Sequence, residues 1–439
     1  MNLIQPRWRH FLFVFAAVLA CAWCIVRDTN LTEQYPGDLR NRVVGARLQS
    51  DGVSPYFYHW KTGNDERFYD WNNNSPVSKI SNVTATPFFH QMMVPLSKFP
   101  QKTIAWLWLV FAYLAHAIII VCSYKIAGST LQKRLTITAG ILFLFTSAWT
   151  ESVYNGQMYF VIALFAMLLF VSLYNNRYLV PAFFAGVFGV SLILIKITLL
   201  LYLAPFVLFA VNCSKRYLLT LTAGAVVTII FAFSGKQTQY WRDYSAAVKD
   251  HIRSHQGILP ELRERDSLPL LSSIDGWQRA DISTAVRKGW YKNQPAATNV
   301  FVLINKITGT RISITFLSSL LIASLVILTF VYLKKFPLKN QPELFTLALF
   351  GFLLHMTTDY FSPVHRFHYY AAQWSFPLLL VAAFYHRSFP LILTIGVLIG
   401  MFFNGLPVSI FPMQHTIGEY ILYGSFFGIL FSYKQQGPV

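Results

Sequence analysis

The sequence has 439 residues, of which 55% are hydrophobic, 17% aromatic and only 12% charged. A soluble domain averages about 25% charged residues, so this composition excludes an ordinary water-soluble protein. Many apolar runs reach the roughly 17–25 residues that cross a bilayer. They predict an all-α, polytopic transmembrane protein in which residues 1–439 form a single integral membrane domain. The net charge of +18 is typical of loops that face anionic lipid, and no separate basic domain indicates a nucleic-acid partner.

The apolar runs predict about twelve membrane spans. In chain order these cover 9–26, 102–122, 135–150, 157–173, 179–195, 197–211, 217–233, 312–333, 342–357, 368–385, 389–403 and 417–433. The run 178–211 could instead be one long kinked helix, but Lys196 near its middle favours two spans. Lys and Arg recur in the short turns on one side and are absent from 151–156 and 404–416 on the other. This asymmetry predicts that both termini are cytoplasmic.

Two long polar segments, 27–101 and 234–311, fall on the outer side of this topology. Loops of this length in a compact protein are usually functional or disordered. The first is rich in aromatic residues, which favours an ordered structure at the membrane surface, and the second shows helical charge patterns. We therefore expect the functional residues to lie at the outer face.

The first outer loop contains "GDLRNRVVGARLQSDG", in which the apolar residues follow helical spacing. The pattern predicts a short amphipathic helix in the interface, with Asp38 at its N-cap and Gly52 at its end. Arg42 occupies a polar position of the same helix. On spacing alone, Asp38 needs no role beyond capping. A second amphipathic segment, which contains two prolines, follows at 86–100.

Two polar residues then lie near the outer ends of later spans. Gln157 opens a span directly after Gly156, and an amide at membrane depth needs a partner. Lys196 lies in the apolar run "SLILIKITLLLYLAP", where a lysine is costly and marks a functional site by default. It could bind an anionic headgroup at the outer face, or it could only extend its ammonium group to the interface.

The segment "TTDYFSPVHRFHYYAAQW" (357–374) contains four further candidates between two spans: Asp359, His365, Arg366 and His368. Histidine and arginine at an outer membrane surface suit a phosphate group. His365, His368 and Asp359 could alternatively bind a metal ion. No HxxxH, HExxH or acidic pair makes such a site specific, so we expect no metal.

Together these segments resemble the membrane-embedded glycosyltransferases of the C-type fold, and in particular glycosyltransferase family 87, the polyprenol-phosphate-mannose-dependent mannosyltransferases. The resemblance covers most of the chain up to about residue 380. It rests on five motifs in order: "GDLRNRVVGARLQSDGVSPY" with Asp38, Gly52 and Tyr56; "TPFFHQMMVPLSKFP"; "NGQMYF" with Gln157; "LILIKITLLLYLAP" with Lys196; and "SPVHRFH" with His368.

The chain also departs from the family pattern. The usual paired prolines are reduced to Thr86-Pro87, the usual His-His pair reads His368-Tyr369, and Arg366 replaces a tryptophan. These differences bear on the sugar and the acceptor more than on the fold.

The resemblance implies an inverting transferase that moves a mannose-like hexose from a polyprenyl-monophosphate sugar to a lipid or glycan acceptor. It places this reaction at the outer face of the membrane, which is the periplasmic side of a bacterial inner membrane. It implies Asp38 as the base that deprotonates the acceptor hydroxyl. The donor phosphate would be bound by Lys196, Arg366, His365 and His368, and further site candidates are Arg42, Tyr56, Gln157 and Asp359. Because the leaving group is already a phosphate, we expect no metal and no cofactor to be required. The remaining partners are membrane lipids.

Two other functions stay open. A polysaccharide polymerase or ligase would use a diphosphate-linked glycan and would not need Asp38. A transporter of lipid-linked glycans would have inverted repeats and polar residues through the bilayer midplane, whereas the polar residues here gather at the outer face.

Overall fold

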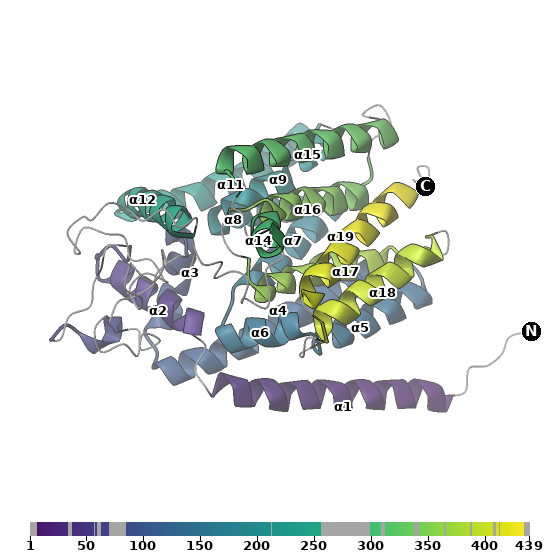
Figure 1. The fold of residues 1–439 in the computed structure, drawn as a ribbon, viewed down its shortest axis with the longest axis horizontal. Coiled ribbons are helices and arrows are strands. Elements are labelled where there is room, and N and C mark those ends of the chain that lie inside the picture. Colours follow the sequence, from purple (N-terminus) through teal and green to yellow (C-terminus); the bar gives the residue numbers. More distant parts are fainter. Residues whose placement is uncertain are drawn as a thin grey trace, which may run out of the picture.

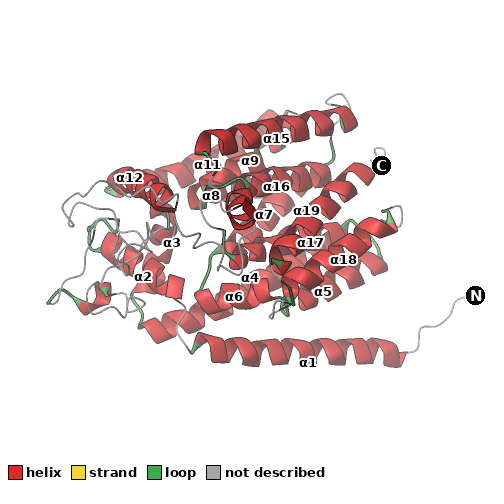
Figure 2. Cartoon of the chain, viewed as in Figure 1, coloured by secondary structure: helices red, strands yellow, loops and turns green. Residues whose placement is uncertain are grey.

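The structure is a computed structural model that describes residues 7–33, 37–56, 58, 63–69, 85–211, 213–255, 299–308, 312–337, 342–363, 366–386, 389–406, 410–411 and 413–433. Within these ranges every regular element is a helix and no strand is present (Figure 2). The expected all-α class is confirmed.

The helices follow one another in the order expected for a polytopic protein. They are α1 (Arg7–Thr32), α2 (Gly37–Ser50), η1 (Glu66–Phe68), α3 (Pro87–Ser97), α4 (Gln101–Ile126), α5 (Thr130–Phe143), α6 (Ser147–Asn155), α7 (Tyr159–Tyr174), α8 (Leu179–Ile195), η2 (Ile197–Leu199), α9 (Leu200–Leu203), α10 (Phe206–Ala210), α11 (Lys215–Phe233), α12 (Gln237–His255), α14 (Val300–Thr308), α15 (Ile314–Lys335), α16 (Leu344–Tyr360), η6 (His368–Trp374), α17 (Ser375–Ala383), α18 (Leu391–Gly405) and α19 (Gln414–Ser432).

Among the described residues, four helices are long and apolar enough to cross a membrane: α1 from Val14, α4, α11 and α15. The pair α6 and α7 would count as a fifth, broken span, with a bend of 112° between its halves. Helices α8, α16 and α18 are apolar but shorter. Membrane helices are therefore present, while the expected number of about twelve spans is not confirmed.

The expected span at 135–150 is interrupted. Helix α5 ends at Phe143, and α6 begins as a separate helix whose N-cap, Thr146, accepts a hydrogen bond from the backbone N–H of Trp149. The residues expected to form an outer turn at 151–156 are mostly helical and belong to α6. The turn itself lies at 156–158, between α6 and α7.

The run 178–211 is not one helix. Helix α8 ends at Ile195, because Lys196 takes an extended backbone conformation with φ −150° and ψ 110°. The expected span at 197–211 consists of the short elements η2, α9 and α10. Pro205, which has no N–H for a helical hydrogen bond, separates α9 from α10.

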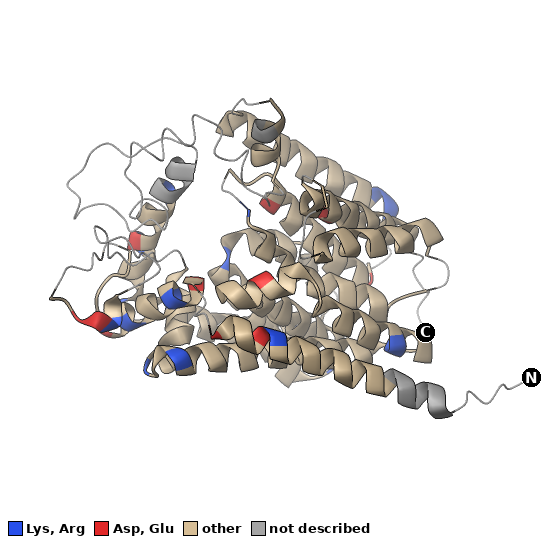
Figure 3. Cartoon of the chain, turned by 60° about the horizontal axis from the view of Figure 1, so that its bottom comes forward, with Lys and Arg blue, Asp and Glu red and all other residues tan. Residues whose placement is uncertain are grey.

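The start of α1 and the end of α19 lie at the same end of the helical bundle, and α2, α3 and α12 lie at the opposite end (Figure 1). This arrangement agrees with two termini on one side of the membrane and outer-loop helices on the other. That the termini face the cytoplasm stays a prediction. Charged residues are sparse along most of the bundle (Figure 3). Large apolar side chains of α1 and α15 are exposed, as lipid-facing helices require: Val18, Trp23, Val26, Ile322, Val326 and Phe330.

Helix α1 is fixed to the bundle by a fully buried carboxylate. Asp28 is 0% exposed and accepts hydrogen bonds from the hydroxyl of Tyr113 on α4, at 2.6 Å, and the indole of Trp149 on α6, at 2.8 Å. Arg27 pairs with its other oxygen at 2.7 Å.

Candidate functional site

Helix α2 lies within the polar segment 27–101, where the sequence predicts a short helix. Its last turn is closed by Gly52, whose φ of +78° is the left-handed conformation that glycine adopts freely at a helix end. The N–H of Val53 donates to the carbonyl of Leu48 at 2.9 Å across this turn. The sequence predicted Asp38 at the N-cap of this helix. The helix instead begins at Gly37, so Asp38 lies inside its first turn.

Helices α2 and α3 pack closely through Gly45 and His90. A methyl group on Gly45 would lie 2.6 Å from Nε2 of His90, so only glycine allows this approach. His90 is fully buried, and burial together with the nearby Arg42 cation lowers its pKa to about 3, which keeps the imidazole neutral. On α3, Thr86 caps the helix and Pro87 occupies its first position. The packing fixes the face of α2 that carries Asp38.

The carboxylate of Asp38 is held by side chains from two other parts of the chain. The amide of Gln157, between α6 and α7, donates a hydrogen bond to Oδ2 of Asp38. The hydroxyl of Tyr369, on η6, donates a second hydrogen bond to the same carboxylate. Asp38 is partly buried, whereas Gln157 is 1% exposed.

Arg42, one turn after Asp38 on α2, completes this arrangement. Its guanidinium donates to the side-chain oxygen of Gln157 at 2.7 Å and to the carbonyl of Gly156 at 2.8 Å. Gly156 ends α6 with φ +63°, a left-handed conformation that turns its carbonyl and Gln157 toward α2. The Gln157 amide therefore bridges the cation of Arg42 and the anion of Asp38.

The surroundings of Asp38 suit a carboxylate that accepts a proton. Burial raises the pKa of the Asp38 carboxyl above its ordinary value. The Arg42 cation and the hydrogen bonds from Gln157 and Tyr369 stabilise the ionised form and limit this rise. A raised pKa makes a carboxylate a stronger base while it is still ionised near neutral pH.

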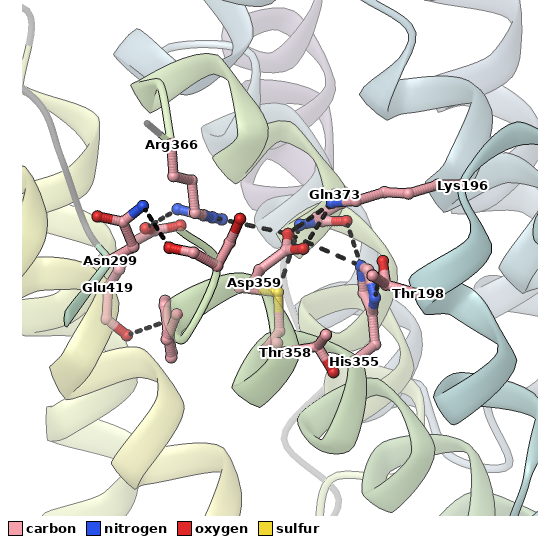
Figure 4. A network of polar contacts seen from close by, with 12 residues as sticks. Lys196, Thr198, Asn299, His355, Thr358, Asp359, Arg366, Gln373 and Glu419 are labelled. Atoms are coloured by element: carbon pink, nitrogen blue, oxygen red, sulfur yellow. Dashed lines mark hydrogen bonds and ion pairs between the residues drawn. The ribbon is translucent and has the colours of Figure 1, made fainter. Parts of the chain in front are cut away.

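Lys196 forms a buried ion pair that the sequence did not indicate. Its Nζ lies 2.6 Å and 2.8 Å from the two carboxylate oxygens of Asp359, at the end of α16 (Figure 4). The ammonium also lies over the rings of Tyr159 and Tyr370, at 5.5 Å and 5.3 Å from their centroids. A lysine at this depth is thus stabilised by one carboxylate and two aromatic faces.

Arg366 lies on the other side of Asp359 (Figure 4). Its Nε is 3.7 Å from Asp359, and its guanidinium donates to Glu419 on α19. Glu419 is 0% exposed and also accepts a hydrogen bond of 2.8 Å from the indole of Trp374. Two buried carboxylates and two cations therefore form one continuous network, which removes the cost of isolated buried charges.

Three tyrosines connect this network to Asp38. The rings of Tyr159 and Tyr370 stack at 4.2 Å, and those of Tyr369 and Tyr370 lie 5.3 Å apart. Tyr370 faces Lys196, and Tyr369 donates to Asp38. The predicted base, Asp38, and two of the predicted phosphate ligands, Lys196 and Arg366, thus lie on two sides of the same aromatic group.

His368 is buried and is not accessible to a ligand. Its Nδ1 lies 3.2 Å from Glu151 on α6 and its Nε2 lies 2.8 Å from the side-chain oxygen of Asn404, so both ring nitrogens have partners. The imidazole is 1% exposed, and its ring centroid lies 4.1 Å from that of His415 at a tilted angle. A direct phosphate contact would have to replace one of these partners, which leaves an indirect role as the simpler assignment.

Two other candidates differ from the expectation or lie outside the described ranges. Tyr56 is fully buried and donates to the carbonyl of Ala85 at 2.7 Å, so it joins the end of α2 to the start of α3. His365 lies outside the described residues. Within the described ranges, no three His, Cys, Asp or Glu side chains gather as metal ligands would.

Sequence reasoning missed the partners of the predicted residues. Glu419, Glu151 and Gln373 are polar residues that contact Arg366, His368 and Asp359 respectively. A signal existed for Glu419, because a carboxylate within an apolar span marks a site by default. The three tyrosines carried no such signal, because tyrosine is common wherever membrane helices meet water.

Comparison with known families supports one assignment. Residues 84–261 match the family model of glycosyltransferase family 87. No curated protein and no solved structure matches the chain. The family match confirms the resemblance drawn from the motifs and indicates a glycosyltransferase. It includes Gln157 and Lys196, whereas Asp38 and the 359–368 segment lie beyond it, so their assignment rests on the geometry above.

Proposed function

We propose that this glycosyltransferase moves a hexose from a polyprenyl-monophosphate sugar to a hydroxyl of a lipid or glycan acceptor, with inversion at the anomeric carbon. The observation that carries the proposal is the position of one basic carboxylate, Asp38, opposite an ion-pair network in which Lys196 and Arg366 are the cations. Tyr369 and Tyr370 lie between the two. An inverting transfer needs a base on one side of the sugar and an anion-stabilising group on the other.

Asp38 would act on the acceptor. Its carboxylate takes the proton from the attacking hydroxyl as the acceptor oxygen bonds to the anomeric carbon of the donor. The bond between that carbon and the phosphate oxygen breaks at the same time, and the electron pair leaves with the polyprenyl phosphate. Gln157 and Arg42 keep the carboxylate ionised and oriented until the proton arrives.

Lys196 would bind the departing phosphate, because it carries the more accessible of the two cations. Its side chain is 19% exposed, whereas that of Arg366 is 1% exposed. Arg366 contributes positive potential from behind, held by Glu419. His368 acts as a positioning residue, since both of its ring nitrogens are used by Glu151 and Asn404.

The polyprenyl tail places this chemistry at a membrane surface. The apolar helices keep the protein in the bilayer, and α2, α3 and α12 lie together at one end of the bundle (Figure 1). We propose that this end is the outer, periplasmic face of a bacterial inner membrane. Neither a metal nor a cofactor is needed, because a phosphate leaves without protonation.

The test compares donors. Purified protein in detergent is given a lipid-extract acceptor with either a polyprenyl-monophosphate mannose or a diphosphate-linked oligosaccharide. Transfer of a single hexose from the monophosphate donor, retained in Asp51→Asn and lost in Asp38→Asn, supports the proposal. Asp51 is a matched control because it is an exposed carboxylate near the end of the same helix, paired with Arg67 at 3.0 Å. Transfer from the diphosphate donor alone would favour a polymerase instead.

A further inference from the structure

The ion pair between Lys196 and Asp359 has no role in the proposed transfer step. Both oxygens of Asp359 bind the Lys196 ammonium, at 2.6 Å and 2.8 Å. This is the geometry in which a phosphate group would bind the same cation. The carboxylate therefore occupies the position at Lys196 that an anionic ligand would take.

The two partners differ in their access to a ligand. The Lys196 side chain is 19% exposed and that of Asp359 only 5%, so a ligand meets the ammonium first and the carboxylate lies behind it. A phosphate that bound Lys196 beside an unmoved Asp359 would bring two anions together. The phosphate and the Asp359 carboxylate would then repel each other strongly, because both are negative and the site is buried.

Asp359 has other partners ready if Lys196 turns away. Nε2 of Gln373 donates to it at 3.2 Å, Nε of Arg366 lies at 3.7 Å and Nε2 of His355 at 3.9 Å. Figure 4 shows these side chains grouped around the carboxylate. The carboxylate can thus lose the lysine without becoming an isolated buried charge, which would be prohibitively costly.

The second buried carboxylate lacks this freedom. Glu419 is 0% exposed and is bound by both Arg366 and Trp374, so it is a fixed counter-ion of the arginine. Of the two carboxylates in the network, Asp359 is the one placed to exchange its partner.

We propose that Asp359 is an internal competitor for the phosphate subsite. It holds Lys196 before the donor binds, gives the ammonium up to the donor phosphate, and takes it back after transfer, which releases the polyprenyl phosphate product. The inference rests on the proposed function, because it concerns the phosphate of the same donor. Asp359 contributes no proton and no bond in the reaction, so it is a positioning residue.

A substitution that removes the charge of Asp359 should therefore raise the affinity for phosphate and lower the turnover rate. If Lys196 is available in only a minor state, the apparent affinity for phosphate is reduced by the size of that fraction. A minor state of about 0.1–10% corresponds to a loss of roughly tenfold or more. Removing the charge of Asp359 therefore strengthens phosphate binding and slows product release.

The test measures binding of farnesyl monophosphate, a short polyprenyl phosphate, to the purified full-length protein by calorimetry. We expect Asp359→Asn to bind it at least about tenfold more tightly than wild type, and to turn over more slowly under multiple-turnover conditions. Asp51→Asn, which removes an exposed carboxylate from another Asp–Arg pair, should leave the affinity unchanged. Unchanged or weaker binding by Asp359→Asn would overturn the inference and make Asp359 a structural anchor of Lys196.

Two further measurements keep the test decisive. Gln373→Met removes a fallback partner of Asp359, so it should weaken farnesyl phosphate binding although Gln373 is fully buried. This variant replaces Asp359→Asn if the latter does not fold, and unchanged or tighter binding then contradicts the inference. Inorganic phosphate, tested alongside, separates recognition of the phosphate from that of the lipid.

The result also separates the two proposals. If wild type transfers the sugar and binds farnesyl phosphate but Asp359→Asn does not bind it more tightly, only the competitor role fails. If wild type neither transfers the sugar nor binds any prenyl monophosphate, the proposed function fails, and the competitor role fails with it.

Discussion

Gln157 donates a hydrogen bond to the carboxylate of Asp38 although the two residues are 119 positions apart in the chain. The other end of the same amide accepts a hydrogen bond from Arg42. An amide can serve an anion and a cation at once, because it carries a donor and an acceptor on one planar group. The break between α6 and α7 thus sets the ionisation and the orientation of the proposed base.

This relationship predicts a shift in pH dependence. The hydrogen bond from Gln157 stabilises the ionised form of Asp38, so its loss in Gln157→Leu raises the pKa of Asp38 further. Because the base works only when ionised, the acidic limb of kcat/KM should move to higher pH, by roughly one pH unit. The measurement is a pH–rate profile of hexose transfer.

The matched control for that profile is Gln91→Leu. Gln91 lies on α3 and donates to the carbonyl of Phe231, so its replacement removes an outer-face amide that does not contact Asp38. Its acidic limb should coincide with that of wild type. A Gln157→Leu profile that only loses amplitude, without moving along the pH axis, would contradict the assignment of Asp38 as the titrating base.

The contact between Gly45 and His90 predicts a defined packing defect. An added methyl group would lie within 2.6 to 2.9 Å of three ring atoms of His90, which is fully buried and has little room to move. Gly45→Ala should therefore destabilise the protein by about 1–3 kcal/mol and reduce transfer, because α2 and Asp38 are displaced. Thermal unfolding and the transfer assay measure the two effects.

Gly424→Ala is the control for this substitution. Gly424 is also a helical glycine, and nothing lies within 4 Å of the position of an added methyl group. Alanine there should be neutral or stabilising by up to about 1 kcal/mol. Equal effects of the two substitutions on stability and transfer would show that the α2–α3 contact at Gly45 does not require glycine.

The buried Asp28 predicts a stability effect far from the proposed chemistry. Asp28→Asn removes the ion pair with Arg27 and alters the bonds from Tyr113 and Trp149. We expect a loss of about 3 kcal/mol in the free energy of unfolding, with α1 as the part that detaches first. Limited proteolysis between α1 and α2 would report this detachment. Cleavage as slow as in wild type would speak against the anchor.

The local elements of the outer loop could be predicted from sequence because their signals are local. The spacing of Leu39, Val43 and Ala46 predicted α2, and Gly52 predicted its end. The apolar runs likewise predicted most of the helices, because lipid exposure imposes a composition that is visible within one segment.

The interruptions of the spans were harder to predict. An apolar run does not reveal that Thr146 caps a new helix, because the same residues could continue α5. The pairing of side chains was harder still. Asp359 lies 163 positions from Lys196, and the sequence named both residues without indicating that each neutralises the other. Such long-range pairs depend on how helices are arranged, and no local pattern encodes that arrangement.

Single-turnover transfer by Asp38→Asn separates proton removal from phosphate binding. We expect the variant to bind farnesyl monophosphate as wild type does, while the transfer rate from a polyprenyl-monophosphate hexose falls by about 10²–10⁴-fold, the usual contribution of general-base catalysis. Preserved phosphate binding would show that the phosphate subsite is intact and that only proton removal is lost. A transfer rate within a few-fold of wild type would contradict the account, because Asp38 would then not be the base.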